Sequence, residues 1–202
     1  MASKTDICNR ALIKLGKATI RDIDTDESPQ GTLCKAVFVP MLDEVLRQAE
    51  WNFAVNRQAL NQDASNSPLY EWAYKYILPT VPPVIKIISV ENNVPFKIEG
   101  NFLVSNSNSI KLKYIGRITD PNLYDPLFIN VLVLRIAYEI SFSLTSQTSL
   151  GDNIYKQYLL ALEEARNQNS QDDNELPIQD STWTNARLMA ISPFYNNNNN
   201  NA

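Results

Sequence analysis

The sequence predicts a mainly α-helical protein with a small antiparallel β insertion, an α+β fold. Apolar residues recur at helical spacing in the first 60 residues and again after residue 124. The segment between these blocks alternates short apolar runs with turn-forming residues, which is typical of an antiparallel sheet. We therefore expect a bundle of about four helices from residues 1–60 and 124–170, a β-rich insertion at 69–120, and an extended or disordered C-terminal arm at 171–202.

The first helix is predicted over about residues 4–15. Ser3 can cap its N-terminus, and Asp6 three positions later completes a weak capping box. Gly16 stands where a helix commonly ends on a left-handed residue. The apolar positions form one stripe along this helix: Ile7, Cys8, Ala11, Leu12 and Leu15.

A second helix is predicted over about residues 28–50. Ser28 is a suitable N-cap, and Pro29 suits the first helical position because its φ is already helical. Pro40 removes a backbone donor inside the helix and crowds the preceding turn, so we expect a kink there. Its apolar residues keep the helical period: Leu33, Cys34, Val37, Phe38, Met41, Leu42, Val45, Leu46 and Ala49.

The middle of the chain predicts short strands. Residues 70–79 are rich in aromatic side chains and alternate, so we expect an extended segment. Turn-forming pairs such as Asn92-Asn93 and Gly100-Asn101 separate the apolar runs that follow. The candidate strands are residues 84–90, 95–98, 102–105 and 110–115.

A third helix is predicted over about residues 126–144, with Asp125 as N-cap and Pro126 at its first position. It is apolar around much of its circumference, which is typical of a helix at the centre of a bundle or buried by a neighbouring subunit. We expect four of its residues at a subunit interface: Phe128, Leu132, Tyr138 and Phe142.

A fourth helix is predicted over about residues 151–167. One face is apolar: Ile154, Tyr158, Leu159, Leu162 and Ala165. The chain then becomes polar and acidic, and residues 170–202 carry a net charge of −3. A short apolar motif within this arm has two interpretations, a disordered tail or a segment that orders on a partner. Its candidate anchors are Trp183, Leu188, Met189, Phe194 and Tyr195.

The residue types exclude most catalytic chemistry. The chain has no histidine, so Ser-His catalysis and histidine metal sites are excluded, and its five glycines include no phosphate-binding motif. Cys8 and Cys34 are expected as buried small hydrophobes, although the sequence leaves a disulfide open. We expect no enzyme activity, no metal and no cofactor. A pair of carboxylates remains the alternative, with Glu139 in the apolar third helix as its most interesting member.

Charge and hydropathy bear on partners. No cluster of Lys and Arg is visible along the sequence, so tight sequence-specific DNA binding is not expected. The apolar stretch from Phe128 to Ile140 is interrupted by Asn130, Arg135 and Glu139, so we expect no membrane span. The N-terminus shows no signal-peptide pattern.

Several motifs occur in a fixed order along about residues 5–170. They are Asn9-Arg10-Ala11-Leu12 with Leu15-Gly16, Leu46-Arg47 followed by Trp51-Asn52-Phe53-Ala54, Tyr74-x-Tyr76-x-Leu78-Pro79, the run Lys113 to Asp120, and Pro126-Leu127-Phe128 before Ala137-Tyr138-Glu139. In order and spacing they resemble the head-to-tail adaptor proteins of short-tailed bacteriophages, the family called tail tubular protein A or tail accessory factor. The asparagine run at the C-terminus departs from that pattern.

The resemblance implies a structural role. Adaptors of this family form a ring, typically twelvefold, beneath the portal protein, where they extend the DNA channel and offer a docking surface to the tail nozzle or fibres. Genome DNA would pass through without tight specific binding. The resemblance also implies that residues 176–195 form a portal-binding arm, and that the protein belongs to the tail or neck of a virion assembled in the bacterial cytoplasm.

Two alternatives stay open at this point. A head-completion or stopper protein of another phage tail type would carry similar helices. A wall-degrading tail component would instead use two carboxylates, for which Glu139 and Glu163 are candidates.

Overall fold

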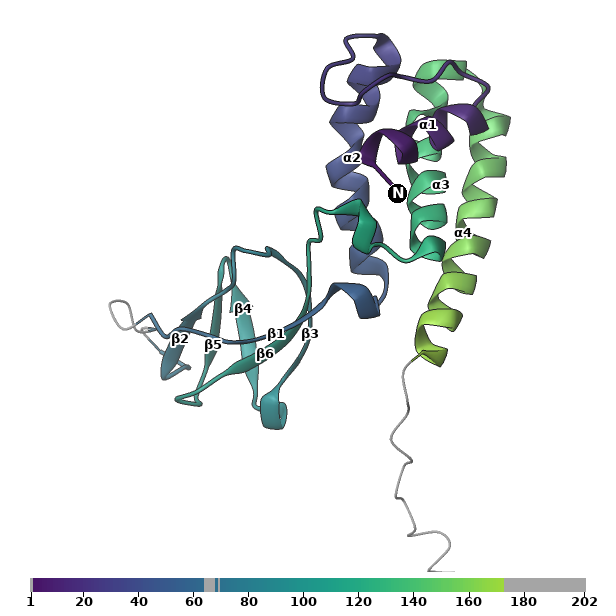
Figure 1. The fold of residues 1–202 in the computed structure, drawn as a ribbon. Helices are drawn as coiled ribbons and strands as arrows, with labels where there is room; N and C mark the ends of the chain where they lie inside the picture. The colour runs from purple at the N-terminus through teal and green to yellow at the C-terminus, as the bar shows by residue number, and fades with distance from the viewer. Residues whose placement is uncertain (1, 64–67, 69, 173–202) are drawn as a thin grey trace, which may run out of the picture. The chain divides into compact units, whose positions relative to one another are not determined.

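The computed structural model describes residues 2–63, 68 and 70–172. Within them the chain forms four α-helices and two small antiparallel sheets, which confirms an α+β fold (Figure 1). The predicted arm lies outside the described residues from residue 173 onward, and so do its five candidate anchors, Trp183, Leu188, Met189, Phe194 and Tyr195.

The helices begin where the capping residues predict. Ser3 and Asp6 form the full capping box of α1 (Lys4–Lys14). Ser28 accepts a hydrogen bond from the Gly31 N–H at the start of α2 (Pro29–Gln48), which continues through Pro40. Asp125 accepts hydrogen bonds from two backbone N–H groups of α3 (Pro126–Thr145).

Helix α4 (Thr148–Gln171) is longer at both ends than its apolar pattern predicts. The connection from α3 is short because Ser146 takes a left-handed conformation that ends α3. The polar end of α4 is held by tertiary contacts. Asn169 donates a hydrogen bond to the Glu50 carbonyl at 2.9 Å and accepts one from the Asn52 N–H at 2.9 Å.

Helix α3 packs against each of the other three helices. Phe128 and Leu132 are completely buried inside this core. By length and composition α3 is apolar enough to cross a membrane, more so than the interrupted stretch from Phe128 to Ile140 predicts, but more than half of its most apolar stretch is buried inside the protein. Its position among the other helices accounts for that apolarity.

The described residues of the β region form six strands in two sheets of three. One sheet has the order β1-β6-β3, from β1 (Val55–Ala59), β6 (Lys111–Gly116) and β3 (Val84–Val90). The other has the order β2-β5-β4, from β2 (Tyr74–Ile77), β5 (Phe102–Ser105) and β4 (Phe96–Glu99). All pairings are antiparallel, as predicted.

Strand β1 lies inside the segment predicted to belong to the helical bundle. Its sequence, Val-Asn-Arg-Gln-Ala, carries little apolar alternation, so it gives no local strand signal. It forms because β6, more than 50 residues later, supplies its backbone partners from Ile115 to Lys111. Such non-local pairing is decided by tertiary structure rather than by propensity.

The two sheets are joined on one side only. The residues that follow β1, Asn61 and Asp63, pair with β2. The Ile77 N–H donates to the Asn61 carbonyl (3.0 Å), and the Asp63 N–H donates to the Lys75 carbonyl (2.8 Å). On the other side, within the part of the chain that the structure describes, β3 pairs only with β6, and β4 only with β5. The strands therefore form a partly open barrel whose free edges are β3 and β4.

The β region is anchored to the helices by apolar and polar contacts. Ile115 of β6 is fully buried in the same core as the helices. Arg117, just after β6, grips both carboxylate oxygens of Asp43 in α2, with its Nε 2.6 Å from one of them. This hydrogen-bonded pair raises the pKa of Arg117.

Cys8 and Cys34 are free thiols and both are fully buried, as predicted for small core hydrophobes. Cys8 of α1 and Cys34 of α2 contact each other where the two helices pack in the core. The hydrogen bond with Cys34, together with burial, raises the pKa of the Cys8 thiol.

Candidate functional site

The first candidate site is an apolar surface shared by α3 and α4, which we call the α3/α4 face: Tyr138, Phe142, Tyr155 and Leu159. Tyr138 and Phe142 lie one turn apart on α3, and Tyr155 and Leu159 one turn apart on α4, so each pair shares a side of its helix. The Tyr138 and Tyr155 rings meet at 4.8 Å between centroids and join the two pairs. Phe142 is 65% exposed, Leu159 47% and Tyr155 40%.

A charged network borders this face. Arg135 of α3 donates hydrogen bonds to both carboxylate oxygens of Glu44 in α2, at 2.9 and 2.8 Å, and to Glu139 at 2.8 Å. Burial alone would lower the pKa of Arg135, but the hydrogen bonds to Glu44 and Glu139 outweigh it and raise the pKa. The Arg135 guanidinium also lies 5.4 Å from the Tyr138 ring centroid.

Between this network and the tyrosines is a small hollow of about 280 Å³, lined by residues of α2, α3 and α4. Tyr158 lies on its wall, and burial raises the pKa of its hydroxyl. Arg135 is fixed by its hydrogen bonds, and tyrosine rings line the hollow. The hollow can therefore hold a side chain of a neighbouring molecule in a defined orientation.

The structure divides the four predicted interface residues into two groups. Phe128 and Leu132 lie in the chain's own core, where Phe128 packs edge-on against Trp51 at 5.0 Å between centroids. These two side chains therefore have no surface left to contact a neighbouring subunit. Phe142 is well exposed and Tyr138 is half-buried, and both lie on the α3/α4 face.

Sequence reasoning missed the contribution of α4 to this face. The prediction that Leu159 shares the core face with Ile154 and Leu162 is wrong, because Leu159 is exposed beside that buried stripe. Tyr155 also lies outside the stripe. Two large apolar residues four apart, off the core stripe of a helix, are the signal that could have identified them.

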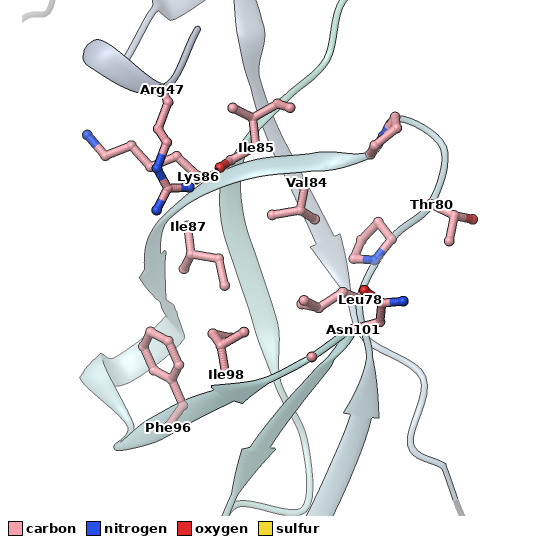
Figure 2. Close-up of a pocket in the computed structure, with 13 residues that line it drawn as sticks. Arg47, Leu78, Thr80, Val84, Ile85, Lys86, Ile87, Phe96, Ile98 and Asn101 are labelled. Carbon is pink, nitrogen blue, oxygen red and sulfur yellow. Dashed lines mark hydrogen bonds between the residues drawn. The ribbon is translucent and has the colours of Figure 1, made fainter. Parts of the chain in front are cut away.

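The second candidate site is a groove between the free edges of β3 and β4, shown in Figure 2. We call it the seam, and it encloses about 880 Å³. Val84 and Ile87 reach into it from β3, and Phe96 and Ile98 from β4 (Figure 2). Phe96 is 36% exposed and Ile98 41%, so the groove has an apolar floor that water contacts.

The β3 side of the seam also carries positive charge. Arg47 of α2 reaches over the strand and donates a hydrogen bond to the Ile85 carbonyl at 2.7 Å (Figure 2). Lys86 lies beside it and reaches Glu50 only at 3.9 Å. The groove is apolar, has cations at one side and lies between two strands that are the outer members of their sheets within the described residues. Such a groove suits an extended, partly acidic polypeptide.

The carboxylates considered for catalysis have structural surroundings. Glu139 is held by Arg135 within the network described above, and Glu163 is exposed on α4. Among the described residues, no group of three or more Asp, Glu, Cys or His side chains is placed to hold a metal ion.

No protein-family model and no curated protein matches this chain.

Proposed function

We propose that this chain is a structural head-to-tail adaptor of a bacteriophage virion. In this proposal it forms a ring of about twelve subunits below the portal protein, extends the DNA channel and gives the tail nozzle or fibres a docking platform. The observation that carries the proposal is the α3/α4 face, an apolar surface left exposed beside a core that is already closed.

Single exposed apolar side chains are ordinary on any protein surface, but a contiguous group indicates an interaction site. Tyr138, Phe142, Tyr155 and Leu159 form such a group across two helices. Aromatic side chains of this kind are frequent energetic centres of interfaces, and Arg135 beside them adds a fixed polar contact. A ring subunit needs a surface of this type for its neighbour.

The seam supports the docking part of the proposal. A free strand edge binds extended segments by main-chain hydrogen bonds, while pockets beside it select side chains. In the seam Ile87 and Ile98 would contact apolar side chains of such a segment, and Arg47 would meet an acidic one. We propose an extended segment of the tail nozzle or fibre as its occupant.

The bundle-and-arm organisation belongs to the same proposal. In it, the four helices are the scaffold of the ring, and residues 176–195 are a portal-binding arm. The apolar side chains of that segment support the idea, since a short segment that cannot bury such side chains in a core of its own can order on a partner.

The test is mass measurement of the full chain, alone and with the portal protein. The expected result is a large ring on the portal. A Phe142→Ser/Leu159→Ser variant should fold normally yet lose ring assembly, because both side chains are exposed in the free chain and would be buried at the interface. The matched control is Val81→Ser/Leu123→Ser, which removes two exposed apolar side chains elsewhere and should leave assembly unchanged.

The proposal fails if the wild-type chain stays monomeric with portal, as a stopper protein of another tail type could. It also fails if deletion of residues 176–202 leaves virion assembly unaffected and the face variant assembles like its control. Loss of cell-wall lysis in Glu139→Gln and Glu163→Gln variants that fold normally would favour the carboxylate enzyme instead.

A further inference from the structure

A second hollow lies on the sheet β1-β6-β3, and its charge is unusual. Arg57 of β1 and Lys113 of β6 are direct partners in the antiparallel register, so two cations stand opposite each other. The next position on the same side pairs Ala59 with Lys111. On the other flank of β6, Lys113 faces Ser89 of β3.

These cations are not neutralised within the described part of the chain. The hollow encloses about 360 Å³, and Glu91 is the acidic residue on its wall. Glu91 is already engaged, because Lys111 donates a hydrogen bond to it at 2.9 Å. Neither Arg57 nor Lys113 forms a side-chain hydrogen bond or an ion pair with another described residue.

Like charges directly opposite on adjacent strands destabilise a sheet. A concave surface with charges of one sign also concentrates counter-ions of the other sign. The register of β1 and β6 thus places Arg57 and Lys113 together as a candidate anion site.

We infer that this hollow contacts phosphate groups of a nucleic-acid backbone. Arginine offers a fork of N–H donors that matches a phosphate, and lysine adds a compact charge. The uncompensated positive charge lies on Arg57 and Lys113, because Lys111 at the next pair is engaged with Glu91. Charge complementarity therefore favours an anionic group such as a phosphate at the Arg57–Lys113 pair.

The choice of nucleic acid over other polyanions rests on the proposed function, in which DNA traverses the ring. Contacts to phosphates alone carry no sequence information and weaken steeply with salt. Two cations per subunit would guide DNA without holding it, which agrees with the net charge of −4 of the whole chain.

The experiment measures binding of a mixed-sequence DNA duplex to the full, unassembled chain between about 50 and 200 mM salt. The test variant is Arg57→Gln/Lys113→Gln. The matched control is Lys14→Gln/Lys156→Gln, which removes the same charge from two exposed lysines on helices. Thermal unfolding followed by circular dichroism verifies that both variants fold.

Wild type and control should lose affinity with salt equally. Because each lost phosphate contact lowers the slope of log K against log salt by about 1, the test variant should show a slope shallower by about 2. Between about 50 and 200 mM salt, the affinity of the test variant for DNA should therefore fall about tenfold less than that of wild type.

Equal slopes in the test variant and the control would overturn the inference. So would competition by poly-glutamate as strong as that by DNA at equal charge, which would indicate an acidic protein partner. Complete displacement by inorganic phosphate at matched ionic strength would indicate a single-anion site and likewise overturn it. Because the chain is unassembled in this experiment, failure of ring formation on the portal is a separate result.

Discussion

At the scale of single residues, Arg135 is the clearest case of a side chain whose role depends on its partners. Its side chain is only 11% exposed, and it is held by Glu44 on another helix and by Glu139 one turn further along α3. The sequence singles out Glu139 as a carboxylate in an apolar helix. Its surroundings show an ion pair that connects α2 and α3 beside the α3/α4 face.

Replacing this arginine should therefore cost more than replacing an exposed cation. Arg135→Met keeps the length of the side chain but leaves two carboxylates close together without a cation. We expect a loss of about 1–2 kcal/mol in the free energy of unfolding, measured by urea titration. Lys97→Met is the control, because Lys97 and Glu99 are both mostly exposed and their pair should contribute less than about 0.5 kcal/mol. Equal losses in the two variants would contradict the structural role of the network.

At the scale of elements, the sheet β1-β6-β3 has one part that packs in the helical core and another that carries opposed positive charges. Its end near the helices is apolar, since Ile115 belongs to the helical core, while the middle pair of β1 and β6 sets the cations Arg57 and Lys113 opposite each other. Local sequence gives no reason for that opposition, because the two residues are more than 50 positions apart. It exists only once β1 and β6 pair.

The opposed charges should reduce the stability of the sheet. We expect the free energy of unfolding to rise from wild type to Arg57→Gln, which removes the repulsion, and again to Arg57→Glu, which replaces it with attraction. The total gain should be about 0.2–1 kcal/mol, measured by urea titration at low salt. High salt should shrink the differences, since exposed charges are screened. A decrease in stability along the series would show that the two cations do not repel each other in the folded protein.

Elements also show how far the sequence can be used for prediction. The four helices and the strands β3 to β6 were predictable because caps, apolar periods and turn residues are local signals. Strand β1 and the ends of α4 were not, because β6 and the contacts of Asn169 supply what their own sequences lack. The candidate sites followed the same division: Phe142 was predicted, while Leu159 and the seam were not.

At the scale of the whole molecule, the described residues contain two apolar cores, one among the helices and one inside the β region. All described members of both cores lie before residue 166. Helix α4 closes the first core with Leu162 and Ala165, both buried.

A chain that ends at residue 172 should therefore fold as well as the full chain. We expect its urea midpoint to be unchanged and its transition to be single and cooperative. A chain that ends at residue 161 is the control, because it loses Leu162 and Ala165 and should be destabilised by at least about 2–5 kcal/mol. A lower midpoint for the first truncation would mean that residues after 172 contribute to folding.

The sequence by itself determined the secondary structure of most of this protein, the mainly helical α+β class and the lack of histidine chemistry, because each depends on residue identity and short-range spacing. Tertiary structure alone decided which apolar side chains of α3 became core and which became surface. It also left β3 and β4 as free edges and set Arg57 against Lys113. These outcomes depend on partners distant in the chain, and such partners become neighbours only when the chain is folded.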